Sequence, residues 1–460
     1  MSEFELSQLR ENAYIHMVGI GGVSMSGIAE ILLSMGFKIS GSDNNASDTT
    51  KRLESNGIKI CIGQSEKNIN DDIALVAYTA AVKQDNPELV EARKRNIPCM
   101  ERSDLLGELT RIYNNTIAIC GTHGKTTTTS MVSLAFMQAN MNPTVQVGAD
   151  LRQLNNTNYR IGGPDYFIIE ACEYVRSFLS FSPKSVVLLN IEEDHLDYYK
   201  DLEDIKSAFN EFVSYVPRDG VIVYNNDDTN CVEVVNGKVA NKISFGINSN
   251  ADWIAENIKL ENGFYTFDAK SKDAEIKIHL KVPGYHHIYN ALSTIAISHF
   301  YGIDLNDVAL ALSDFTGAHR RFEYVGTINN AKIYDDYAHH PTEIKATIKA
   351  GNELKTNKLW VIFQPHTYSR TYTLFDEFAN AFSEADKVIL TDIYAAREID
   401  TGLVSSKMLS EAINKISNNC IYIPTFEEIK SFLKENVKEN DLVLTVGAGN
   451  ITKLGYDIKD

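Results

Sequence analysis

The chain has 460 residues, enough for about three domains of ordinary size. Its composition, 44% hydrophobic and 23% charged, is typical of a globular protein and excludes a disordered or fibrous chain. A formal net charge of −17 argues against nucleic acid or an anionic membrane surface as the main partner, because both bind basic faces.

The six cysteines are scattered without a CxxC pair, which favours reduced thiols over a disulfide framework or a zinc site. The N-terminal segment has no basic stretch followed by an apolar core, so we expect no signal peptide. The longest uncharged run, at 126–149, is too rich in Thr, Ser, Gln and Asn to span a bilayer. These features predict a cytoplasmic protein with no membrane partner.

Residues 14–110 alternate between short apolar runs and helical periodicity, which predicts a parallel, doubly wound sheet. The run YIHMV leads into a glycine turn at 19–27, and a helix is expected at 26–35. A dinucleotide fingerprint needs glycine where Ser24 stands, but Asp43 follows at the distance of a ribose-binding acid. The turn is compatible with a dinucleotide fold, a nucleotide-sugar pocket or a tight turn that binds nothing.

A second glycine loop, GTHGKTTTT at 121–129, lies between an apolar run and a helical pattern. This is the context of a phosphate loop: backbone amides face the phosphates, Lys125 reaches the β- and γ-phosphates, and Thr126 can bind Mg²⁺. Ile119 stands where the general motif has its first glycine, so the loop is a shortened variant. Because one chain carries two nucleotide-type loops, we expect two different phosphate-bearing ligands.

Acidic and histidine side chains follow the next two predicted strands, DYFIIEA and SVVLLNI. The residues concerned are Glu170 and Glu173 after the first strand, and Asn190, Asp194, His195 and Asp197 after the second. Carboxyl ends of parallel strands line the same crevice, so these groups could hold Mg²⁺ beside a triphosphate. The alternative is a solvated acidic loop.

The rest of the chain predicts a strand at GVIVYNN, an antiparallel patch at 242–280, a helix at 287–301 and a third α/β cycle from Ala331. We therefore predict an α/β fold of three domains, each built on a mainly parallel sheet. They are a Rossmann-like domain at 1–112, a central phosphate-loop ATPase with the antiparallel patch at 113–322, and a second Rossmann-like domain at 323–460.

Four segments rich in His, Arg and Tyr lie in the second half: PGYHHIYNA, FTGAHRRFE, DDYAHHPTE and QPHTYSR. Arginine suits bidentate capture of phosphate or carboxylate. With the two glycine loops, DHLDYY, the DNPE at 85–88 and the GAGN at 447–450, these segments resemble the Mur ligase family nearly end to end. The first glycine turn, DDYAHHPTE and QPHTYSR are most similar to the alanine-adding member.

The resemblance implies an ATP-dependent ligase that joins L-alanine to the carboxylate of UDP-N-acetylmuramate through an acyl phosphate, in bacterial peptidoglycan synthesis. A sister ligase that attaches a preformed tripeptide to the same sugar is the alternative. The cofactors expected are ATP and Mg²⁺, the partners are small molecules, and the protein is expected to be a monomer or a homodimer. A nucleotide switch has no need of the third, histidine-rich domain, and a dehydrogenase leaves Lys125 and Thr126 unexplained.

Site residues follow from the resemblance, motif by motif. The catalytic residues are Lys125, His195 and His339. ATP contacts are Gly121, Thr122, His123, Gly124, Lys125, Thr126, Thr127, Asn290, Arg321 and Asp336, and Mg²⁺ ligands are Thr126, Glu173 and His195. The UDP-sugar contacts are Gly19, Ile20, Gly21, Gly22, Met25, Ser26 and Asp43, and the amino-acid contacts are Tyr337, His366 and Arg370. The chain departs from the family pattern at Ser24, His287 and Thr367.

Overall fold

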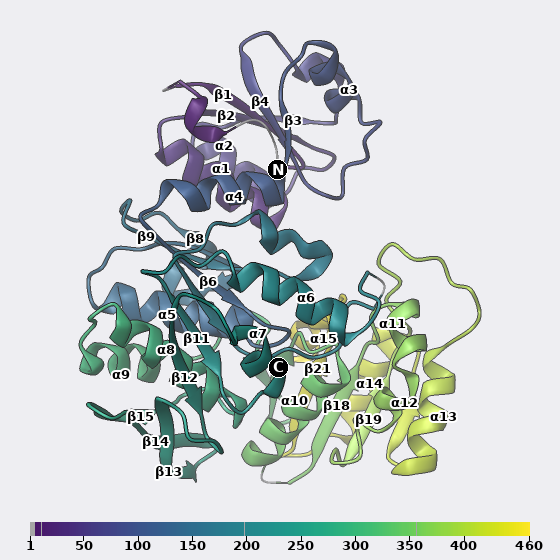
Figure 1. Cartoon of the computed structure of the whole chain (residues 1–460). Helices are drawn as coiled ribbons and strands as arrows, with labels where there is room; N and C mark the ends of the chain where they lie inside the picture. The colour runs from purple at the N-terminus through teal and green to yellow at the C-terminus, as the bar shows by residue number, and fades with distance from the viewer. Residues whose placement is uncertain (1–4, 11, 197, 356) are drawn as a thin grey trace.

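The computed structural model describes residues 5–10, 12–196, 198–355 and 357–460. Three sheets follow one another along the chain, from the purple N-terminal part to the yellow C-terminal part in Figure 1. The predicted α/β fold on three mainly parallel sheets is confirmed. Within the ranges described, no helix is long and apolar enough to cross a membrane.

The N-terminal sheet is entirely parallel. Its strands are β1 (Tyr14–Val18), β2 (Lys38–Asp43), β3 (Lys59–Ile62), β4 (Ile73–Tyr78) and β5 (Cys99–Glu101), and its helices are α1 (Val23–Ser34), α2 (Asp48–Ser55), α3 (Pro87–Lys94) and α4 (Arg102–Ile112), with 3₁₀ turns η1 (Leu6–Gln8) and η2 (Glu66–Asn68). The strand order is β3-β2-β1-β4-β5, so the order reverses at β1. Ligands of such sheets bind outside the carboxyl ends of the strands at this switch point, which is where the first glycine turn lies.

The central sheet is the largest. Its strands are β6 (Asn115–Cys120), β7 (Thr144–Leu151), β8 (Thr157–Arg160), β9 (Tyr166–Glu170), β10 (Ser185–Leu188), β11 (Val221–Asn225), β12 (Asn241–Gly246), β13 (Trp253–Glu261), β14 (Phe264–Lys270) and β15 (Glu275–His279). Its helices are α5 (Lys125–Gln138), α6 (Leu202–Val213), α7 (Thr229–Val235), α8 (His286–Phe300) and α9 (Leu305–Asp314), with 3₁₀ turns η3 (Arg152–Leu154) and η4 (Tyr174–Ser180). The strand order is β15-β14-β13-β12-β11-β10-β6-β9-β7-β8.

The predicted antiparallel patch at 242–280 is wrong for its first strand. β12 pairs in parallel with β11 and with β13, because the sheet continues past β11 in the same direction. The antiparallel part of this patch is the meander β13 to β15, at the lower left of Figure 1. The sequence prediction missed β7, β8 and β13, in which polar residues interrupt the apolar pattern.

Helix α5 carries the phosphate loop on its N-terminus and is buried against α8 and α9. Its core face is rich in hydroxyls, which is unusual for a buried helix. Thr129, Ser130 and Ser133 each donate to the carbonyl four residues earlier, at 2.7–2.8 Å. These hydroxyls are therefore satisfied within the helix, and the loop stands on a packed core.

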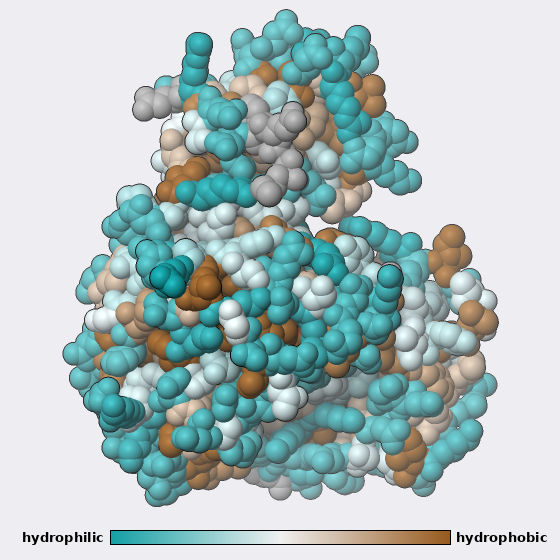
Figure 2. All heavy atoms as spheres, viewed as in Figure 1, coloured by the Kyte–Doolittle hydropathy of each residue, from teal (hydrophilic) through white to brown (hydrophobic). Residues whose placement is uncertain are grey.

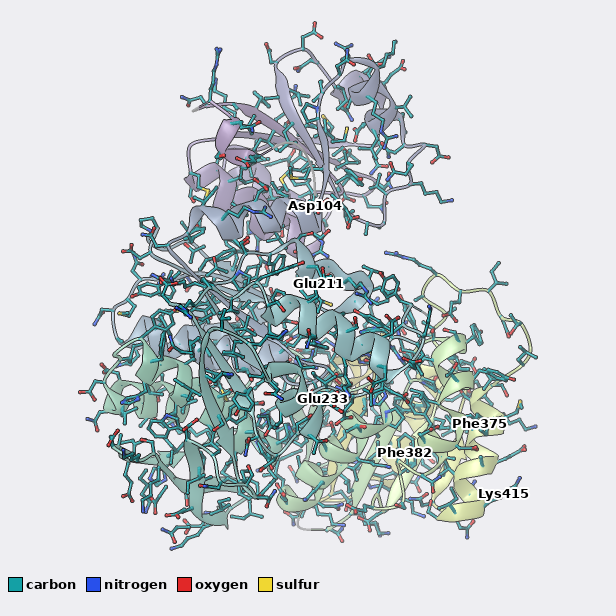
Figure 3. All side chains as sticks on the ribbon, viewed as in Figure 1. Asp104, Glu211, Glu233, Phe375, Phe382 and Lys415 are labelled. Carbon is teal, nitrogen blue, oxygen red and sulfur yellow. The ribbon has the colours of Figure 1, made fainter. Side chains whose placement is uncertain are left out.

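In the C-terminal sheet, two segments of the site, residues 337–340 and 364–370, each follow the carboxyl end of a strand. Its strands are β16 (Glu323–Ile328), β17 (Ala331–Asp336), β18 (Leu359–Phe363), β19 (Lys387–Leu390), β20 (Cys420–Tyr422) and β21 (Leu442–Val446), and its helices are α10 (Pro341–Leu354), α11 (Tyr368–Thr373), α12 (Phe375–Ala379), α13 (Ser406–Ile416), α14 (Phe426–Asn436) and α15 (Ile451–Ile458). Only β16, at the edge, is antiparallel in the order β16-β17-β21-β18-β19-β20. In Figure 3, Lys415 marks the outer side of α13, while the buried ring of Phe382 packs 5.3 Å from that of Phe363.

Several hydrogen bonds join the N-terminal and central parts, most of them involving α4. The Ser180 hydroxyl donates to Asp104 of α4 at 2.8 Å, and the Asn158 amide donates to the Val23 carbonyl at 3.3 Å. Figure 3 labels Asp104 at the lower edge of the N-terminal part. Figure 2 shows a mostly hydrophilic face that is indented on the right between this part and the rest of the molecule.

Candidate active site

The phosphate loop joins β6 to α5 and turns at two glycines with positive φ, Gly121 (+139°) and Gly124 (+84°). The side chain of Asn190, just beyond β10, holds its main chain. Asn190 Oδ1 accepts from the amide of His123 at 2.7 Å, and its Nδ2 donates to the carbonyl of His123 at 3.1 Å. The predicted strand, loop and helix are all present.

Lys125 is nearly buried and folds back on this loop. Its Nζ donates to the carbonyls of Gly121 and Thr122 at 2.7 and 2.9 Å and pairs with the Glu173 carboxylate at 2.9 Å. Burial alone lowers the pKa of Lys125, but Glu173 and the neighbouring acidic groups raise it overall, so the ammonium is charged. Glu173 is only 2% exposed, and Lys125 supplies the charge that balances it.

The predicted metal ligands lie around the start of α5. His195 Nε2 is 3.7 Å from Glu173 Oε1 and also 3.7 Å from Asp194 Oδ2. The hydroxyl of Thr126 is 3.4 Å from Nη2 of Arg321, which reaches in from the C-terminal side. Carboxylate and hydroxyl oxygens are the donors that Mg²⁺ prefers. Asp197, of the same predicted cluster, lies outside the described residues.

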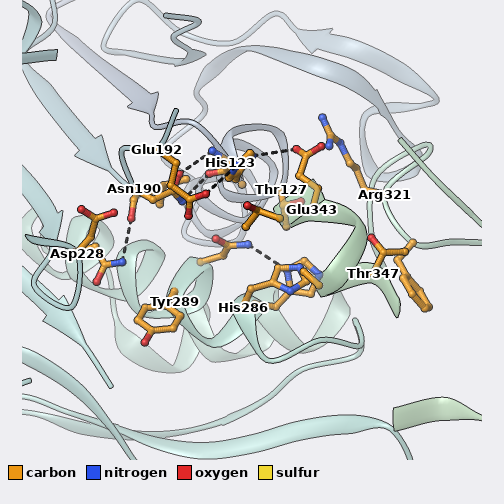
Figure 4. A pocket seen from close by; sticks show the side chains of 18 of the residues that line it. His123, Thr127, Asn190, Glu192, Asp228, His286, Tyr289, Arg321, Glu343 and Thr347 are labelled. Atoms are coloured by element: carbon orange, nitrogen blue, oxygen red, sulfur yellow. Dashed lines mark hydrogen bonds and ion pairs between the residues drawn. The ribbon is translucent and has the colours of Figure 1, made fainter. Parts of the chain in front are cut away.

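His123 extends from the phosphate loop across to the C-terminal domain. Its Nδ1 is 3.2 Å from Glu343 Oε1 at the start of α10, and its Nε2 is 3.5 Å from Glu192 Oε2. Burial alone lowers the pKa of His123, but the two carboxylates raise it to about 10. The side chain is therefore an imidazolium, and Figure 4 shows it next to Glu192 and Glu343.

Side-chain atoms of His123, Glu192 and His340 lie within 4.8 Å of one another, close enough to hold a metal ion. The hydrogen positions argue against that reading. His340 Nδ1 accepts from the amide of Thr342 at 3.3 Å, so its Nε2 carries a hydrogen, and the His123 imidazolium carries a hydrogen on each nitrogen. The two imidazoles direct N–H groups toward this point, so they offer no lone pair to a metal ion.

A cavity of about 360 Å³ opens between the phosphate loop, α8 and α10. Six predicted ATP contacts line it: His123, Gly124, Thr127, Asn290, Arg321 and Asp336. Burial raises the pKa of Asp336 to about 6, against the opposing charge of Arg321. The sequence analysis missed Asn225, Asp227, Asp228, His286 and Tyr289, which also line it. Asp227 and Asp228 could have been suspected from the sequence, because they come just after the end of a buried strand.

Asn290 lies against the phosphate loop, because a Cβ on Gly124 would meet its Oδ1 at 3.0 Å. Its amide nitrogen is 3.1 Å from Nδ1 of His287. His287 is buried, and burial lowers its pKa well below the usual value, so it is neutral. At this departure from the family pattern, His287 therefore serves to fix the amide of Asn290.

A second cavity, of about 550 Å³, lies where β10 of the central sheet faces the C-terminal sheet. The predicted amino-acid contacts Tyr337, His366 and Arg370 all line it, as does His339. Arg370 Nη2 reaches Asp194 Oδ1 at 3.3 Å, and both side chains are largely buried. Burial alone raises the pKa of Asp194, but His195 and Arg370 hold it well below the usual value.

His339 is neutral in this cavity, because burial lowers its pKa to about 4. Its Nδ1 is 3.0 Å from the carbonyl of Tyr337 and so carries the hydrogen, which leaves the lone pair on Nε2. The sequence analysis missed Arg397 and Glu398 on the far wall. Glu398 accepts from the Thr367 hydroxyl at 2.7 Å, so Thr367, another departure, anchors this wall.

A third cavity, also of about 550 Å³, lies at the switch point of the N-terminal sheet. Gly19, Gly22 and Asp43 line it, and Asp43 Oδ2 accepts from the amide of Gly21 at 3.0 Å. The side chains of three other predicted contacts, Ile20, Met25 and Ser26, are buried. Additional lining residues, not predicted, are Asn44, Gln64, Thr79, Lys83 and Asn86. The third departure, Ser24, is 3.3 Å from Arg102 through its hydroxyl.

Comparisons with known proteins cover the same three parts. Family models described as "Mur ligase family, catalytic domain", "Mur ligase middle domain" and "Mur ligase, glutamate ligase domain" match residues 14–114, 119–298 and 320–449. The chain is similar to a UDP-N-acetylmuramate–L-alanine ligase of Acetivibrio thermocellus, with 50% identity over 98% of this chain and 97% of that protein.

Solved structures give the same picture. A UDP-N-acetylmuramate–alanine ligase from Thermotoga maritima superposes with a TM-score of 0.80 at 31% identity, covering 97% of this chain and 98% of that one. A murein peptide ligase from Psychrobacter arcticus shares the fold, with a TM-score of 0.70 at 24% identity over 97% and 98% of the two chains. From the motifs, the three sheets and these matches along the full length, the chain belongs to the Mur ligase family.

Proposed function

We propose that the protein joins L-alanine to the carboxylate of UDP-N-acetylmuramate with conversion of ATP to ADP and phosphate, in the cytoplasmic synthesis of peptidoglycan precursors. One observation carries the proposal: the cavity beside the phosphate loop and the cavity containing Arg370 and His339 both lie between the central and C-terminal parts, and Glu343 contacts His123 of the loop and His339 of the second cavity. The alanine ligases to which the chain is similar end to end support it.

Three ligands need three sites, and we assign one of the three cavities to each. The N-terminal cavity at Gly19 and Asp43 takes the UDP sugar, the cavity at Asn290 and Arg321 takes ATP, and the one at Arg370 takes alanine. We place the domain boundaries at 1–112, 113–322 and 323–460. The ATP and alanine sites then lie between the second and third domains.

The chemistry starts from a carboxylate, which is a poor electrophile because oxide is a bad leaving group. Transfer of the γ-phosphoryl group of ATP to the sugar carboxylate gives an acyl phosphate and ADP. Lys125 and Arg321 neutralise the charge on the transferring group. The alanine amine then attacks the acyl carbon, the amide bond forms, and phosphate leaves. Acyl phosphates hydrolyse, so closure of the crevice must exclude water.

Mg²⁺ fits the residues present. The buried carboxylate of Glu173 is paired with Lys125 and would need another cation once a phosphate takes up that ammonium, and the hydroxyl of Thr126 and the imidazole of His195 lie near the same loop. We assign these three side chains as its ligands. When bound, Mg²⁺ neutralises phosphate charge and holds the phosphates in position.

The amine must lose a proton to attack, and His339 is the proposed acceptor. Its Nε2 lone pair is free of a hydrogen, and its ring lies in the amino-acid cavity. The pKa of about 4 keeps this lone pair available at neutral pH, although it makes the imidazole a weak base that must pass the proton on.

Phosphate release tests the proposal. The purified protein, with ATP, Mg²⁺ and UDP-N-acetylmuramate, is assayed against L-alanine, L-serine, glycine and the preformed tripeptide. We expect the highest kcat/KM with L-alanine. A higher value with the tripeptide would favour the peptide-adding alternative, which the lower similarity to a murein peptide ligase makes the weaker candidate.

A further inference from the structure

The carboxylate of Glu343 lines the nucleotide cavity and contacts His339, which lines the amino-acid cavity. Glu343 lies in the first turn of α10, where His340 is the N-cap. Its Oε2 accepts from the backbone amides of His339 and His340 at 3.0 and 3.2 Å. Its Oε1 is 3.2 Å from Nδ1 of His123 in the phosphate loop. The two oxygens of a single side chain thus hold two separate segments of the site.

The segments held by Glu343 serve different ligands. His123 and Glu343 both line the nucleotide cavity, and Figure 4 shows the dashed contact between them. His339 lines the amino-acid cavity, and its Nδ1 is 3.3 Å from the same carboxylate. The rings of His123 and His340 also lie 5.3 Å apart, so the loop and the helix end are packed together.

The Glu343–His123 pair is shielded from solvent and charged. Both side chains are nearly buried, 14% exposed for His123 and 16% for Glu343. Burial alone raises the pKa of Glu343, but His339, His123 and Arg321 lower it well below the usual value. Because this carboxylate is buried and stays charged, it holds the phosphate loop and the start of α10 at a fixed separation.

We propose that Glu343 is a positioning residue that couples the phosphate loop to the amino-acid cavity, holding the His339 main chain in register with His123. The inference rests on the proposed function, because it takes ATP and alanine as the ligands of the two cavities. A nucleotide in the nucleotide cavity contacts His123 and Glu343 together. Through the bond from Glu343 to the His339 amide, it then changes the shape of the alanine site.

The substitution Glu343→Gln separates this role from that of a helix cap. A glutamine in this position still accepts from the backbone amides, as in an ordinary capping box. Its amide NH₂, however, would face the N–H of the His123 imidazolium, so two donors would oppose each other. Glu428→Gln is the matched control: Glu428 occupies the same first-turn position of α14 in the same domain, is exposed, and contacts its N-cap Thr425.

The experiment measures kcat and KM for alanine and for ATP in wild type, Glu343→Gln, His123→Gln, the double variant and Glu428→Gln, with unfolding temperatures for each. We expect Glu343→Gln to lower kcat/KM for alanine at least about fivefold, the lower end of typical coupling between sites. His123→Gln, which leaves the cap intact, should lower it similarly, and the double variant should lose no more than the worse single. Glu428→Gln should match wild type.

A value for Glu343→Gln within twofold of wild type would overturn the inference, as would losses that multiply in the double variant. If Glu343→Gln fails to fold, His123→Gln alone decides: a rise in the KM for ATP with unchanged kcat/KM for alanine refutes the coupling. Wild-type protein without alanine-dependent phosphate release would instead refute the proposed function, so the two failures are distinguishable.

Discussion

Replacing Arg370 by alanine should weaken alanine binding far more than ATP binding. Arg370 is 15% exposed and lies 3.3 Å from Asp194 across the domain boundary. At that distance and an effective dielectric constant of about 20, one ion pair is worth roughly 5 kcal/mol before desolvation is subtracted. The α-carboxylate of a bound amino acid would make the same kind of contact with the guanidinium, in two-pronged form.

Truncating one partner of a largely buried charge pair costs about 2–5 kcal/mol. The smaller figure corresponds to roughly a 30-fold rise in the KM for alanine, since each 1.4 kcal/mol is a factor of ten. ATP is expected to keep its KM within about threefold, because its cavity is lined by other residues. Arg370→Lys should recover part of the loss, because an ammonium keeps the charge without the two-pronged geometry.

The bridge to Asp194 supplies the control. Asp194→Asn removes the ion pair but leaves the guanidinium in place, so it should disturb the domain contact without a comparable rise in the KM for alanine. Steady-state phosphate release, with alanine and ATP varied separately, measures all three variants. Equal effects of Arg370→Ala and Asp194→Asn on the KM for alanine would show that Arg370 only joins the domains.

Three further outcomes are expected. Lys125→Ala should abolish ligation and also lower the unfolding temperature, because it leaves the buried Glu173 carboxylate without the Lys125 ammonium. The double variant Lys125→Ala/Glu173→Ala should recover the unfolding temperature but no activity. Phosphate release and calorimetry measure the two effects. Glu173→Ala and His195→Ala should each raise the Mg²⁺ concentration needed for half-maximal activity, and an unchanged metal requirement in both would remove them as ligands. The pKa of His123 is raised from 6.5 to about 10, so the stability that its ion pairs provide is complete below about pH 6.5 and is lost as pH rises through 10. The difference in unfolding temperature between wild type and His123→Gln should therefore shrink between these pH values. A constant difference would contradict the charged state of His123.

The sequence was most informative where local pattern and chemistry agree. The positions of Lys125 and Thr126 at the start of a helix, and of Arg370 just beyond a buried strand, could be predicted from the strand and turn signals alone. The strand at Trp253 was missed because its second half is mostly exposed on both faces and neither face is apolar along the whole strand, and a single strand does not reveal its neighbours' direction.

Contacts between distant segments were out of reach. Asp227 joins the nucleotide cavity through the hydroxyl of Tyr289, 62 positions away, at 2.9 Å. Glu398 enters the amino-acid cavity because Thr367 holds it. Ile20 and Met25 were expected at the sugar site from motif position, but their side chains turn into the core. A motif locates a turn of the main chain, and packing then decides which of its side chains face the ligand.

In the pair of Lys125 with Glu173, the ammonium proposed to bind phosphate carries its own counterion. When phosphate takes over the ammonium in the proposed reaction, the buried carboxylate loses the positive charge that balances it, and a new cation must arrive. Nucleotide binding is then an ion exchange, and the affinities for nucleotide and metal are thermodynamically linked, each raising the other by the same factor. Nucleotide that arrives without metal would leave a buried anion next to its own phosphates, so we expect the phosphate loop to bind it more weakly than the metal complex.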